Sequence, residues 1–490
     1  MKNLAKAALE KLRRPDLLEK RAYIDGQWIE GETCLAVVDP ATSETIAQVA
    51  HCSEGWIDKA VDAATEAFES WRDTPPAQRG AILRRWAALT REHSYDLAII
   101  MTAEQGKPFK ESLGEIAYGA NFLEWFAAEA ERSYGESIPS HLDGSQLTTK
   151  LQPIGVTAAI TPWNFPSAMI TRKAGAALAA GCPMIVKPAP ETPLSALALA
   201  KLGQEAGIPA GVFQVVTGDA PKLSARLLQR TEVRAFSFTG STQVGRILLR
   251  QSAETVKKVS LELGGHAPFI VFDDSSIEEA VQGCIGAKFA TSGQDCLAAN
   301  RIYVQRSIYE PFVKAFAEAT AALKVGHGLE EDVDIGPMTR VSVANKCRDH
   351  IGNAISLGAR VLTGGMENDL GSSFVSPTVL ADVTDEMDIT FEETFGPVAA
   401  VLPFDTEDEV VRRANDTEYG LAAYVYTNDL RRAARVSDRL EYGMVALNTP
   451  KFTGAPIPFG GWKQSGLGRE GSRHGLAEYM ELKYVCVGGL

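Results

Sequence analysis

Apolar residues in the first part of the chain recur at helical spacing. Between residues 56 and 134 they lie three or four positions apart among charged neighbours, as Ile82, Leu83, Trp86 and Leu89 do. This period places the apolar side chains on one face of a helix. We therefore predict that 56–134 is mainly helical.

From about residue 153 the pattern changes to short β-rich runs separated by helical segments. The runs are 155–160, 184–187, 213–216 and 235–238. Repeated strand, helix and strand units predict a parallel sheet with helices on both faces, the doubly wound arrangement. Ligands on such sheets bind beyond the carboxyl ends of the strands, so we expect Lys187 and 239–241 to share one crevice.

One connection in this sheet can be followed residue by residue. Thr192 can cap a helix over 194–205, with Pro193 at its first position. Gly, Ile and Pro at 207–209 end that helix before the next strand. The segment therefore predicts one complete strand-to-strand crossover.

A second α/β pattern begins near residue 268. It contains β-rich runs at 269–272 and 301–305 and helical segments at 277–289 and 309–323. Two sheets with a groove between them form the simplest architecture for these two patterns.

Two further segments have the pattern of strands but belong to neither sheet. They are 135–152 and the tail 483–487. Exposed strands of this kind usually pair with a partner chain, because an unpaired sheet edge promotes uncontrolled association. We therefore predict an oligomer.

Composition narrows the classes of protein that this chain can be. Its 490 residues are 45% hydrophobic and 23% charged, which is typical of a globular protein of two to four structural units. The formal charge of −13 makes general nucleic-acid binding a poor hypothesis, since an acidic field repels phosphates. No apolar run approaches the ~18 residues of a membrane span, and the N-terminus lacks the features of a targeting peptide, so we predict a cytoplasmic location.

The seven Cys residues are scattered and show no C-x-x-C spacing. Neither a disulfide framework nor a zinc knuckle fits such a distribution, and we expect no metal. Cys296, at the end of Ser292-Gly-Gln-Asp-Cys296, has two interpretations. It is either an inert core thiol or a nucleophile that a polar, partly exposed turn makes reactive by favouring the thiolate.

Two other polar residues stand in unusual surroundings. Glu262 lies within Leu261-Glu-Leu-Gly-Gly265, and it is either a strand-end acid in solvent or a base whose pKa is raised by apolar surroundings. Asn164 lies within Thr161-Pro-Trp-Asn-Phe-Pro166. It is either a turn residue or a rigidly held amide that donates to a developing oxyanion.

The segment Gly240-Ser-Thr-Gln-Val-Gly245 follows a predicted strand and opens a helix, which suits the approach of a phosphate. Its spacing is not G-x-G-x-x-G, so alone it is a weak signal. His266 follows two glycines. It is better interpreted as a residue that hydrogen-bonds to backbone groups than as a catalytic base.

Taken together, these segments closely resemble the NAD(P)-dependent aldehyde dehydrogenase superfamily over essentially the whole chain. The resemblance extends to further segments in the family's order: Val186-Lys-Pro188, Phe238-Thr-Gly-Ser241, Glu392-Glu-Thr-Phe-Gly-Pro397, Pro458-Phe-Gly-Gly461 and Lys463-Gln-Ser-Gly466. Within the superfamily, Ser167-Ala-Met-Ile-Thr-Arg-Lys-Ala-Gly175 and Gly466-Leu-Gly-Arg-Glu-Gly471 resemble the succinate-semialdehyde dehydrogenase branch.

The resemblance implies an α/β fold with two doubly wound, Rossmann-like domains and a small β flap for oligomerisation. The implied division is a cofactor-binding domain over 1–134 and 153–263, a catalytic domain over 264–477, and an oligomerisation segment over 135–152 and 478–490. A homodimer or a homotetramer is the implied assembly.

The resemblance also implies a role for individual residues. Cys296 becomes the nucleophile, Glu262 the general base and Asn164 the oxyanion donor, while Lys173 with Glu481 matches a proton relay. The positions that match cofactor contacts are Thr161, Trp163, Lys187, Pro190, Gly218, Phe238, Gly240, Ser241, Glu393 and Phe395. The positions that match substrate contacts are Arg172, Phe165 and Phe459, to which we add Lys451 as a substitute cation.

The implied reaction is the oxidation of a small aldehyde to its acid with NAD or NADP, through a cysteine thiohemiacetal and thioester hydrolysis. A semialdehyde of the succinate-semialdehyde type is the expected substrate, and a bulkier or aromatic aldehyde is the alternative. A CoA-acylating dehydrogenase is disfavoured because Glu262 is present. A binding protein without activity and a cysteine hydrolase are the competing classes.

Four positions depart from the branch. Ala290 stands six residues before Cys296, where the branch has a substrate-binding Arg. Pro190 replaces the Glu that holds the adenosine ribose in NAD-preferring relatives, so we expect NADP to be accepted. Ala298 removes a second Cys that can form a redox disulfide, and Asp295 places a negative charge beside the nucleophile, which raises a thiol pKa.

Overall fold

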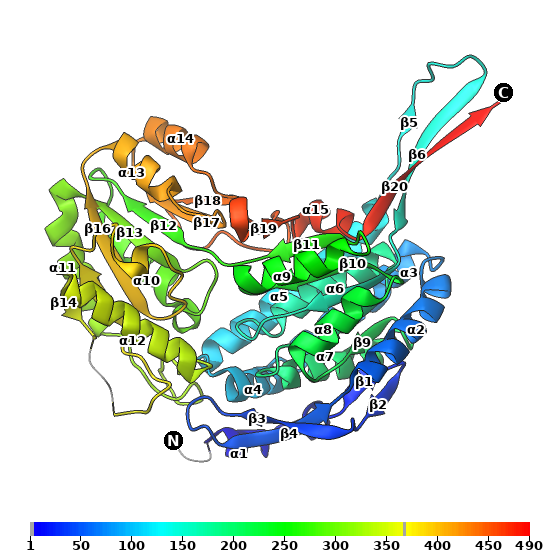
Figure 1. Cartoon of the computed structure of the whole chain (residues 1–490), viewed down its shortest axis with the longest axis horizontal. Helices are drawn as coiled ribbons and strands as arrows, with labels where there is room; N and C mark the ends of the chain where they lie inside the picture. The colour runs from blue at the N-terminus through cyan, green and yellow to red at the C-terminus, as the bar shows by residue number, and fades with distance from the viewer. Residues whose placement is uncertain (1–3, 366–368) are drawn as a thin grey trace.

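The computed structural model describes residues 4–365 and 369–490, and it contains two large sheets with helices on both faces. In Figure 1 the two sheets lie side by side, and a narrow flap carrying the C-terminus projects away from them. This arrangement confirms the predicted fold class. The described residues contain no helix that is both long enough and apolar enough to cross a membrane.

The first large sheet has eight strands, and its five central strands run parallel. In spatial order the strands are β19 (Gly466–Leu467), β11 (Lys258–Glu262), β10 (Val233–Thr239), β7 (Val156–Ile160), β8 (Met184–Lys187), β9 (Phe213–Val215), β1 (Ala22–Ile24) and β2 (Gln27–Ile29). The chain winds outward from β7 in one direction to β9 and then returns to form β10 on its other side. The carboxyl ends of β7 and β10 therefore flank the point where the winding reverses, which is where doubly wound sheets bind ligands.

Helices cover both faces of this sheet, so its central strands are buried throughout. Ala159 and Val186 pack into one apolar cluster, while their neighbours Ala158 and Ile185 pack into another on the opposite face. The helices of this half are α1 (Leu4–Leu9), α2 (Glu54–Trp71), α3 (Pro76–Glu92), α4 (Ser94–Gln105), α5 (Phe109–Glu129), α6 (Ala168–Ala180), α7 (Pro193–Ala206), α8 (Ala220–Gln229) and α9 (Thr242–Ala253).

The second large sheet has seven strands, all parallel to their neighbours except for the edge strand β14. In spatial order they are β14 (Arg360–Thr363), β15 (Thr378–Ala381), β16 (Val398–Phe404), β13 (Ala299–Gln305), β12 (Ala267–Val271), β17 (Ala422–Tyr426) and β18 (Met444–Leu447). The accompanying helices are α10 (Ile277–Phe289), α11 (Tyr309–Ala321), α12 (Val341–Ser356), α13 (Glu407–Asn415), α14 (Leu430–Arg439) and α15 (Ser472–Ala477).

Two smaller sheets complete the fold. The flap pairs β20 (Met480–Gly488) with β6 (Ser145–Pro153) and β6 with β5 (Ser137–Ile138), all antiparallel. The two segments predicted to lie outside both sheets therefore pair with each other. A separate ribbon joins β3 (Thr33–Val38) to β4 (Thr45–His51).

The predicted helix 277–289 coincides with α10, and the helix predicted over 194–205 is α7. The predicted cap of α7 is wrong. Thr192 occupies the capping position, but its hydroxyl makes no capping bond. The carboxylate of Glu104 instead accepts from the backbone N–H groups of Leu194 and Ser195, each at 2.8 Å. Glu104 lies on α4, about ninety residues away in sequence, so local pattern could not reveal it.

The division into domains stays a prediction, and one strand bears on it. β19 lies within the stretch assigned to the catalytic domain, yet it pairs with β11 in the first sheet. Leu467 lies opposite Leu261, and Gly466 lies opposite Glu262. The C-terminal part of the chain thus returns to the first sheet at the strand that carries Glu262.

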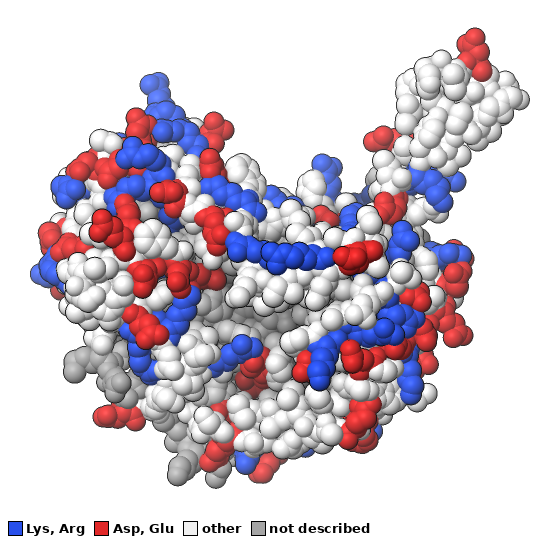
Figure 2. Space-filling model, in the orientation of Figure 1, with Lys and Arg blue, Asp and Glu red and all other residues white. Residues whose placement is uncertain are grey.

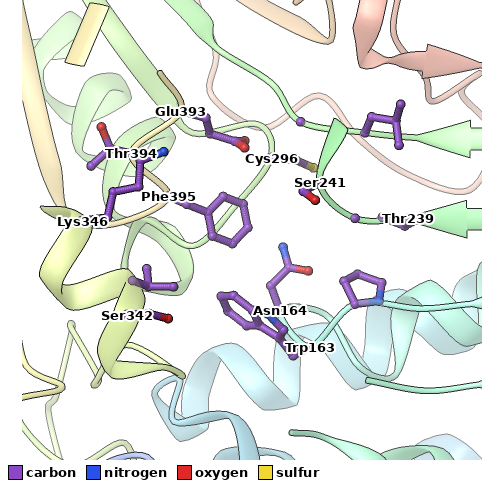
Figure 3. Close-up of a pocket in the computed structure, with 15 residues that line it drawn as sticks. Trp163, Asn164, Thr239, Ser241, Cys296, Ser342, Lys346, Glu393, Thr394 and Phe395 are labelled. Carbon is purple, nitrogen blue, oxygen red and sulfur yellow. The ribbon is translucent and has the colours of Figure 1, made fainter. Parts of the chain in front are cut away.

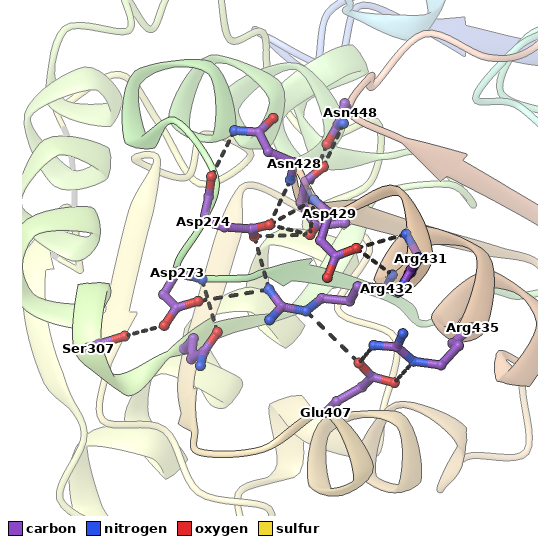
Figure 4. Close-up of polar contacts among 12 residues, drawn as sticks. Asp273, Asp274, Ser307, Glu407, Asn428, Asp429, Arg431, Arg432, Arg435 and Asn448 are labelled. Atoms are coloured by element: carbon purple, nitrogen blue, oxygen red, sulfur yellow. Dashed lines mark hydrogen bonds and ion pairs between the residues drawn. The ribbon is translucent and has the colours of Figure 1, made fainter.

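A polar cluster joins the ends of the second sheet to its helices (Figure 4). Asp274 accepts from the backbone N–H groups of Asn428 and Asp429 and from Arg432 Nη1, at 2.8–3.0 Å. Asp429 in turn caps α14 by accepting from Arg431 N and Arg432 N. The cluster fixes the start of α14 relative to the segment that follows β12.

Figure 2 shows one face of the molecule, where Lys and Arg are interspersed with Asp and Glu and a hollow lies between the two halves. The upper part of the flap in that view is largely uncharged. Its exposed apolar side chains include Leu142, Leu482 and Val487.

Candidate active site

The carboxyl ends of three parallel strands meet at one edge of the first sheet. Ile160 of β7 lies opposite Phe238 of β10, and Thr239 of β10 lies opposite Glu262 of β11. The loops that follow these strands line a cavity of about 350 Å³ at the reversal point of the sheet. The opposite wall comes from the second half of the molecule, so the cavity lies in the predicted groove.

Aromatic and polar groups surround this cavity (Figure 3). Trp163 and Phe395 lie edge to face, with ring centroids 5.4 Å apart. Ser241 caps α9 by accepting from Val244 N at 3.4 Å, which places a helix N-terminus beside the cavity. Glu393 Oε1 accepts from Gly265 N at 3.1 Å, and burial raises its pKa to about 7.

A second cavity, of about 300 Å³, lies on the other side of Cys296. Phe165, Phe459 and Tyr118 give it apolar surface, and Arg172 supplies a cation. Ala290 also lines it, at the position where the branch has an Arg. Cys296 lines both cavities, so its sulfur stands where a ligand in one meets a ligand in the other.

The loop that carries Cys296 is strained just before that residue. Thr291 and Ser292 have φ values of 50° and 58°, in the left-handed region that costs energy for residues with side chains. Ser292 Oγ accepts from Gly336 N at 2.8 Å, which holds this conformation. Gly265 packs so closely that a methyl group there would overlap the Cys296 carbonyl oxygen. The Gly-Gly pair after Glu262 is thus needed for the close approach of this loop.

The environment of Cys296 opposes the thiolate. Burial raises the pKa of the thiol well above its usual value, and Asp295 raises it further, while Arg172 acts in the opposite direction. Burial and Asp295 thus act against the interpretation in which the turn favours the thiolate. Asp295 raises the pKa of the Cys296 thiol, which is the direction predicted from the sequence.

Glu262 ends β11 and is 2% exposed. Neither of its carboxyl oxygens has a hydrogen-bond partner among the described residues. Burial raises its pKa well above the usual value, the nearby Glu470 adds to this, and Arg172 and Lys173 act against it. Glu262 is thus a buried acid with a raised pKa, consistent with the second interpretation of the sequence, and is not a solvent-exposed strand end.

Asn164 lies in the loop after β7 and is 4% exposed. Its side chain lines the first cavity, and Nδ2 donates to the carbonyl of Gln294 at 3.0 Å. Gln294 lies two residues before Cys296, so the Asn164 amide borders the loop that carries the nucleophile.

The predicted partner of Lys173 requires a correction. Lys173 is fully buried, and its Nζ binds Ser237 Oγ at 2.8 Å and the carboxylate of Glu470. Arg172 Nε pairs with the other oxygen of the same carboxylate. Glu481 is exposed on β20, opposite Gln152. Glu470 belongs to the segment 466–471 that carried the resemblance, so the signal was present in the sequence, but the wrong Glu was chosen.

The other predicted cofactor positions divide into two groups. Trp163, Gly240, Ser241, Glu393 and Phe395 line the first cavity. The rest lie outside its lining: Thr161, Lys187, Pro190, Gly218 and Phe238.

Two of these outer residues lie at the same sheet edge as the cavity. Lys187 ends β8, is 1% exposed, and its carbonyl accepts from Thr161 N at 3.2 Å. Burial lowers the pKa of the Lys187 ammonium to about 8. The cavity thus shares a sheet edge with Lys187 but does not reach its side chain.

Among the predicted substrate residues, Lys451 is exposed and does not line the second cavity. Sequence reasoning missed Tyr118 and Glu111, which line that cavity from α5. The sequence shows the helical spacing of Glu111 and Tyr118. Only the packing of α5 against the site shows that this face of the helix lines the cavity.

His266 is fully buried, and its Nε2 lies 3.2 Å from the carbonyl oxygens of Ile389 and Glu392. It thus interacts with backbone groups, as expected. No group of three or more His, Cys, Asp or Glu side chains that could hold a metal occurs in residues 4–365 and 369–490.

The fold and this site define an NAD(P)-dependent oxidoreductase with a cysteine at its centre. The chain belongs to the aldehyde dehydrogenase family, whose profile matches residues 28–485. It is a non-acylating aldehyde dehydrogenase, which confirms the predicted class of enzyme.

Similar proteins cover nearly the whole chain. The 3-sulfolactaldehyde dehydrogenase of Pseudomonas putida is 52% identical over 98% of this chain and 99% of its own. The succinate-semialdehyde dehydrogenase [NADP(+)] of Escherichia coli is 49% identical over 98% of this chain and 100% of its own. The crystal structure of succinate-semialdehyde dehydrogenase from Burkholderia pseudomallei is 48% identical, covers 98% of this chain and 100% of its own, and superposes with a TM-score of 0.97.

The pKa of Cys296 gives a prediction that does not depend on turnover. Because the pKa of the thiol is raised, alkylation by iodoacetamide should accelerate about tenfold per pH unit between pH 7 and 9. Asp295→Asn should lower the thiol pKa and so accelerate the reaction at pH 7.5. Mass spectrometry of the labelled peptide measures both, with the exposed Cys34 as internal reference. A rate independent of pH in this range contradicts the raised pKa.

Proposed function

We propose that this enzyme oxidises a small aldehyde with an anionic end, of the succinate-semialdehyde type, to the carboxylic acid with NAD or NADP. The single observation that carries the proposal is the position of Cys296, which lines both the aromatic cavity at the sheet edge and the cavity that contains Arg172. The substrate carbonyl then lies over the sulfur, with its remaining chain toward Arg172.

Cys296 loses its proton to solvent water, and the thiolate attacks the aldehyde carbon, forming the thiohemiacetal oxyanion. The Asn164 amide, together with the backbone N–H of Cys296, donates to the new oxyanion. A pre-positioned donor of this kind stabilises the transition state by about 2.7–4 kcal/mol. The cofactor, when bound, supplies the hydride acceptor that converts this adduct to a thioester.

Glu262 acts as the base for the second half of the reaction. Its buried, unpartnered oxygens accept a proton from the water that hydrolyses the thioester. Its raised pKa makes it a stronger base than an exposed carboxylate. Lys173 and Glu470 lie next to it and provide the relay, in place of the Lys173 and Glu481 pair first expected.

The substrate assignment rests on Arg172 and on the relatives. Succinate semialdehyde and 3-sulfolactaldehyde, named in two relatives, both carry an anion at the end remote from the aldehyde. Arg172 Nε is already paired with Glu470, and Ala290 adds no second cation. A bulkier or aromatic aldehyde is the second candidate, favoured by the small Ala290 side chain and the Phe165, Tyr118 and Phe459 rings.

The cofactor assignment rests on residues at the end of β8 and on the relatives. Pro190 has no carboxylate to repel a 2′-phosphate, and Lys187 provides a positive charge at the same sheet edge. One relative carries NADP(+) in its name, and betaine aldehyde dehydrogenase from Staphylococcus aureus, 34% identical, was solved with NAD+. We propose that NADP is accepted and preferred.

Assembly and location complete the proposal. The flap exposes Leu482 and Tyr484 at 67% and 55%, beside the open edges of its three strands. Such a surface is stabilised by a second copy, so we propose a homodimer or a homotetramer. The cytoplasmic location stays a prediction.

Cys296→Ser tests the central assignment. Serine is a much weaker nucleophile than cysteine without a neighbouring base, so formation of reduced cofactor should fall by at least about 1000-fold. Absorbance of the reduced nicotinamide measures it, and Cys34→Ser, at an exposed site, is the matched control. Turnover at the parent rate in Cys296→Ser would remove the basis of the proposed mechanism.

Ala290→Arg tests the substrate class. A new cation in the cavity should raise kcat/KM for succinate semialdehyde about tenfold relative to uncharged propanal, which corresponds to about 1.4 kcal/mol. Ala290→Met adds comparable bulk without charge and should give no such change in the ratio. Equal effects of both substitutions on both aldehydes indicate that this wall does not face the remote end of the substrate.

Pro190→Glu tests the cofactor assignment. A carboxylate at this position repels the 2′-phosphate and binds ribose hydroxyls, so the ratio of kcat/KM for NAD over NADP should rise at least about tenfold. Pro190→Gln removes the ring without adding charge and should shift the ratio much less. An unchanged ratio in Pro190→Glu places the adenosine ribose elsewhere.

A further inference from the structure

We propose that Lys107 and Glu115 are positioning residues that hold the Asn164 amide in place for the oxyanion. The inference rests on the oxyanion role of Asn164 in the proposed function. It concerns a buried ion pair at the start of α5, behind the loop that carries Asn164. Neither residue belongs to the motifs from which the activity was inferred.

Lys107 contacts the catalytic loop directly. Its side chain is fully buried, and Nζ donates to the backbone carbonyl of Asn164 at 2.6 Å. The same ammonium donates to Glu115 Oε2 at 2.7 Å and lies 4.1 Å from the centre of the Phe165 ring. One cation thus contacts the backbone carbonyl of Asn164 and the side chain of the next residue, Phe165.

Glu115 holds the other end of the same loop. Its Oε1 accepts from the backbone N–H groups of Ser167 and Ala168, at 2.9 and 3.0 Å. These residues open α6, so a carboxylate lies at the positive end of that helix. A single ion pair therefore makes hydrogen bonds to both ends of the segment from Asn164 to Ala168.

The same end of α5 also holds the nucleophile loop. Glu111, one helical turn before Glu115, accepts from Thr291 N with both oxygens at 3.0 Å. Thr291 is the first of the two strained residues before Cys296. Because Asn164 Nδ2 contacts the carbonyl of Gln294, the two loops also touch each other at the point where the oxyanion forms.

A buried ion pair is a poor means of gaining stability, because the desolvation of two charges offsets most of their attraction. It does impose geometry, since each charge must keep its partners. The contacts of Lys107 and Glu115 are directed at backbone groups of the one loop that presents the amide. A displacement of about 1 Å in a catalytic group can cost about 100-fold in rate, so this geometry has a measurable consequence.

A double-mutant cycle tests the proposal in the full-length enzyme. Lys107→Met should lower kcat about 10- to 100-fold while KM for NADP changes less than about twofold. Asn164→Ala should lower kcat about 100- to 1000-fold. If Lys107 acts through the amide, the double mutant should be no slower than Asn164→Ala alone.

Lys110→Met is the matched control for this cycle. Lys110 lies on the same helix, but its exposed Nζ pairs with Asp334 at 2.6 Å, away from both loops. Its substitution should leave kcat unchanged in the parent and in the Asn164→Ala background. Glu115→Gln provides a second route should Lys107→Met not fold, because the amide oxygen still accepts from Ser167 and Ala168 while the charge is lost.

Two outcomes overturn the proposal and are distinguishable. If Lys107→Met or Glu115→Gln slows Asn164→Ala by the same factor as it slows the parent enzyme, these residues act independently of the amide, and the proposed function stands without the positioning role. If Asn164→Ala alone keeps parent turnover, the oxyanion assignment fails and the positioning role fails with it.

Discussion

The close approach of the Gly264-Gly265 backbone to the Cys296 loop is the constraint on which the site depends. These glycines connect β11, which ends in Glu262, to β12 of the second sheet, so the chain passes between the two halves at the reaction centre. Any side chain at Gly265 would displace the Cys296 backbone. Glu262 ends a strand of the first sheet and Cys296 precedes a strand of the second, and this contact brings the two residues to one place.

Burial sets the chemistry of the site as well as its shape. Glu262, Arg172, Lys173 and Glu470 are all nearly inaccessible, and their charges are balanced mainly among themselves. Glu470 accepts both cations, so its pKa is lowered, whereas Glu262 keeps no hydrogen-bond partner among the described residues and its pKa is raised. Two carboxyl groups in one dry region thus have pKa values shifted in opposite directions, and the unpaired one is better suited to receive a proton.

The sequence predicted what depends on local pattern and missed what depends on distant contacts. Strand and helix periodicity placed α10 and the central strands, and the motifs around Asn164, Glu262 and Cys296 identified a common site at the carboxyl ends of β7 and β11. The predicted partner of Lys173 was wrong because Glu470 lies within the last motif and Glu481 beyond it, and only the fold shows which of them turns inward. The sequence left two interpretations of Cys296 open and already indicated that Asp295 raises the thiol pKa, but the further rise caused by burial depends on tertiary packing that local pattern does not show.

The second cavity explains why substrate class is harder to derive than reaction class. Arg172 provides a cation, but Glu470 already pairs with it, and Asp295 and Glu111 add carboxyl groups to the same walls. Burial raises the pKa of Glu111 to about 7, which reduces its negative charge near neutral pH, and burial also raises the pKa of Asp295. The net attraction for an anionic substrate is therefore the small difference between attraction by Arg172 and repulsion by the nearby carboxyl groups. Ala290 is a neutral position in the same wall, so we expect a charge introduced there to change selectivity for an anionic aldehyde.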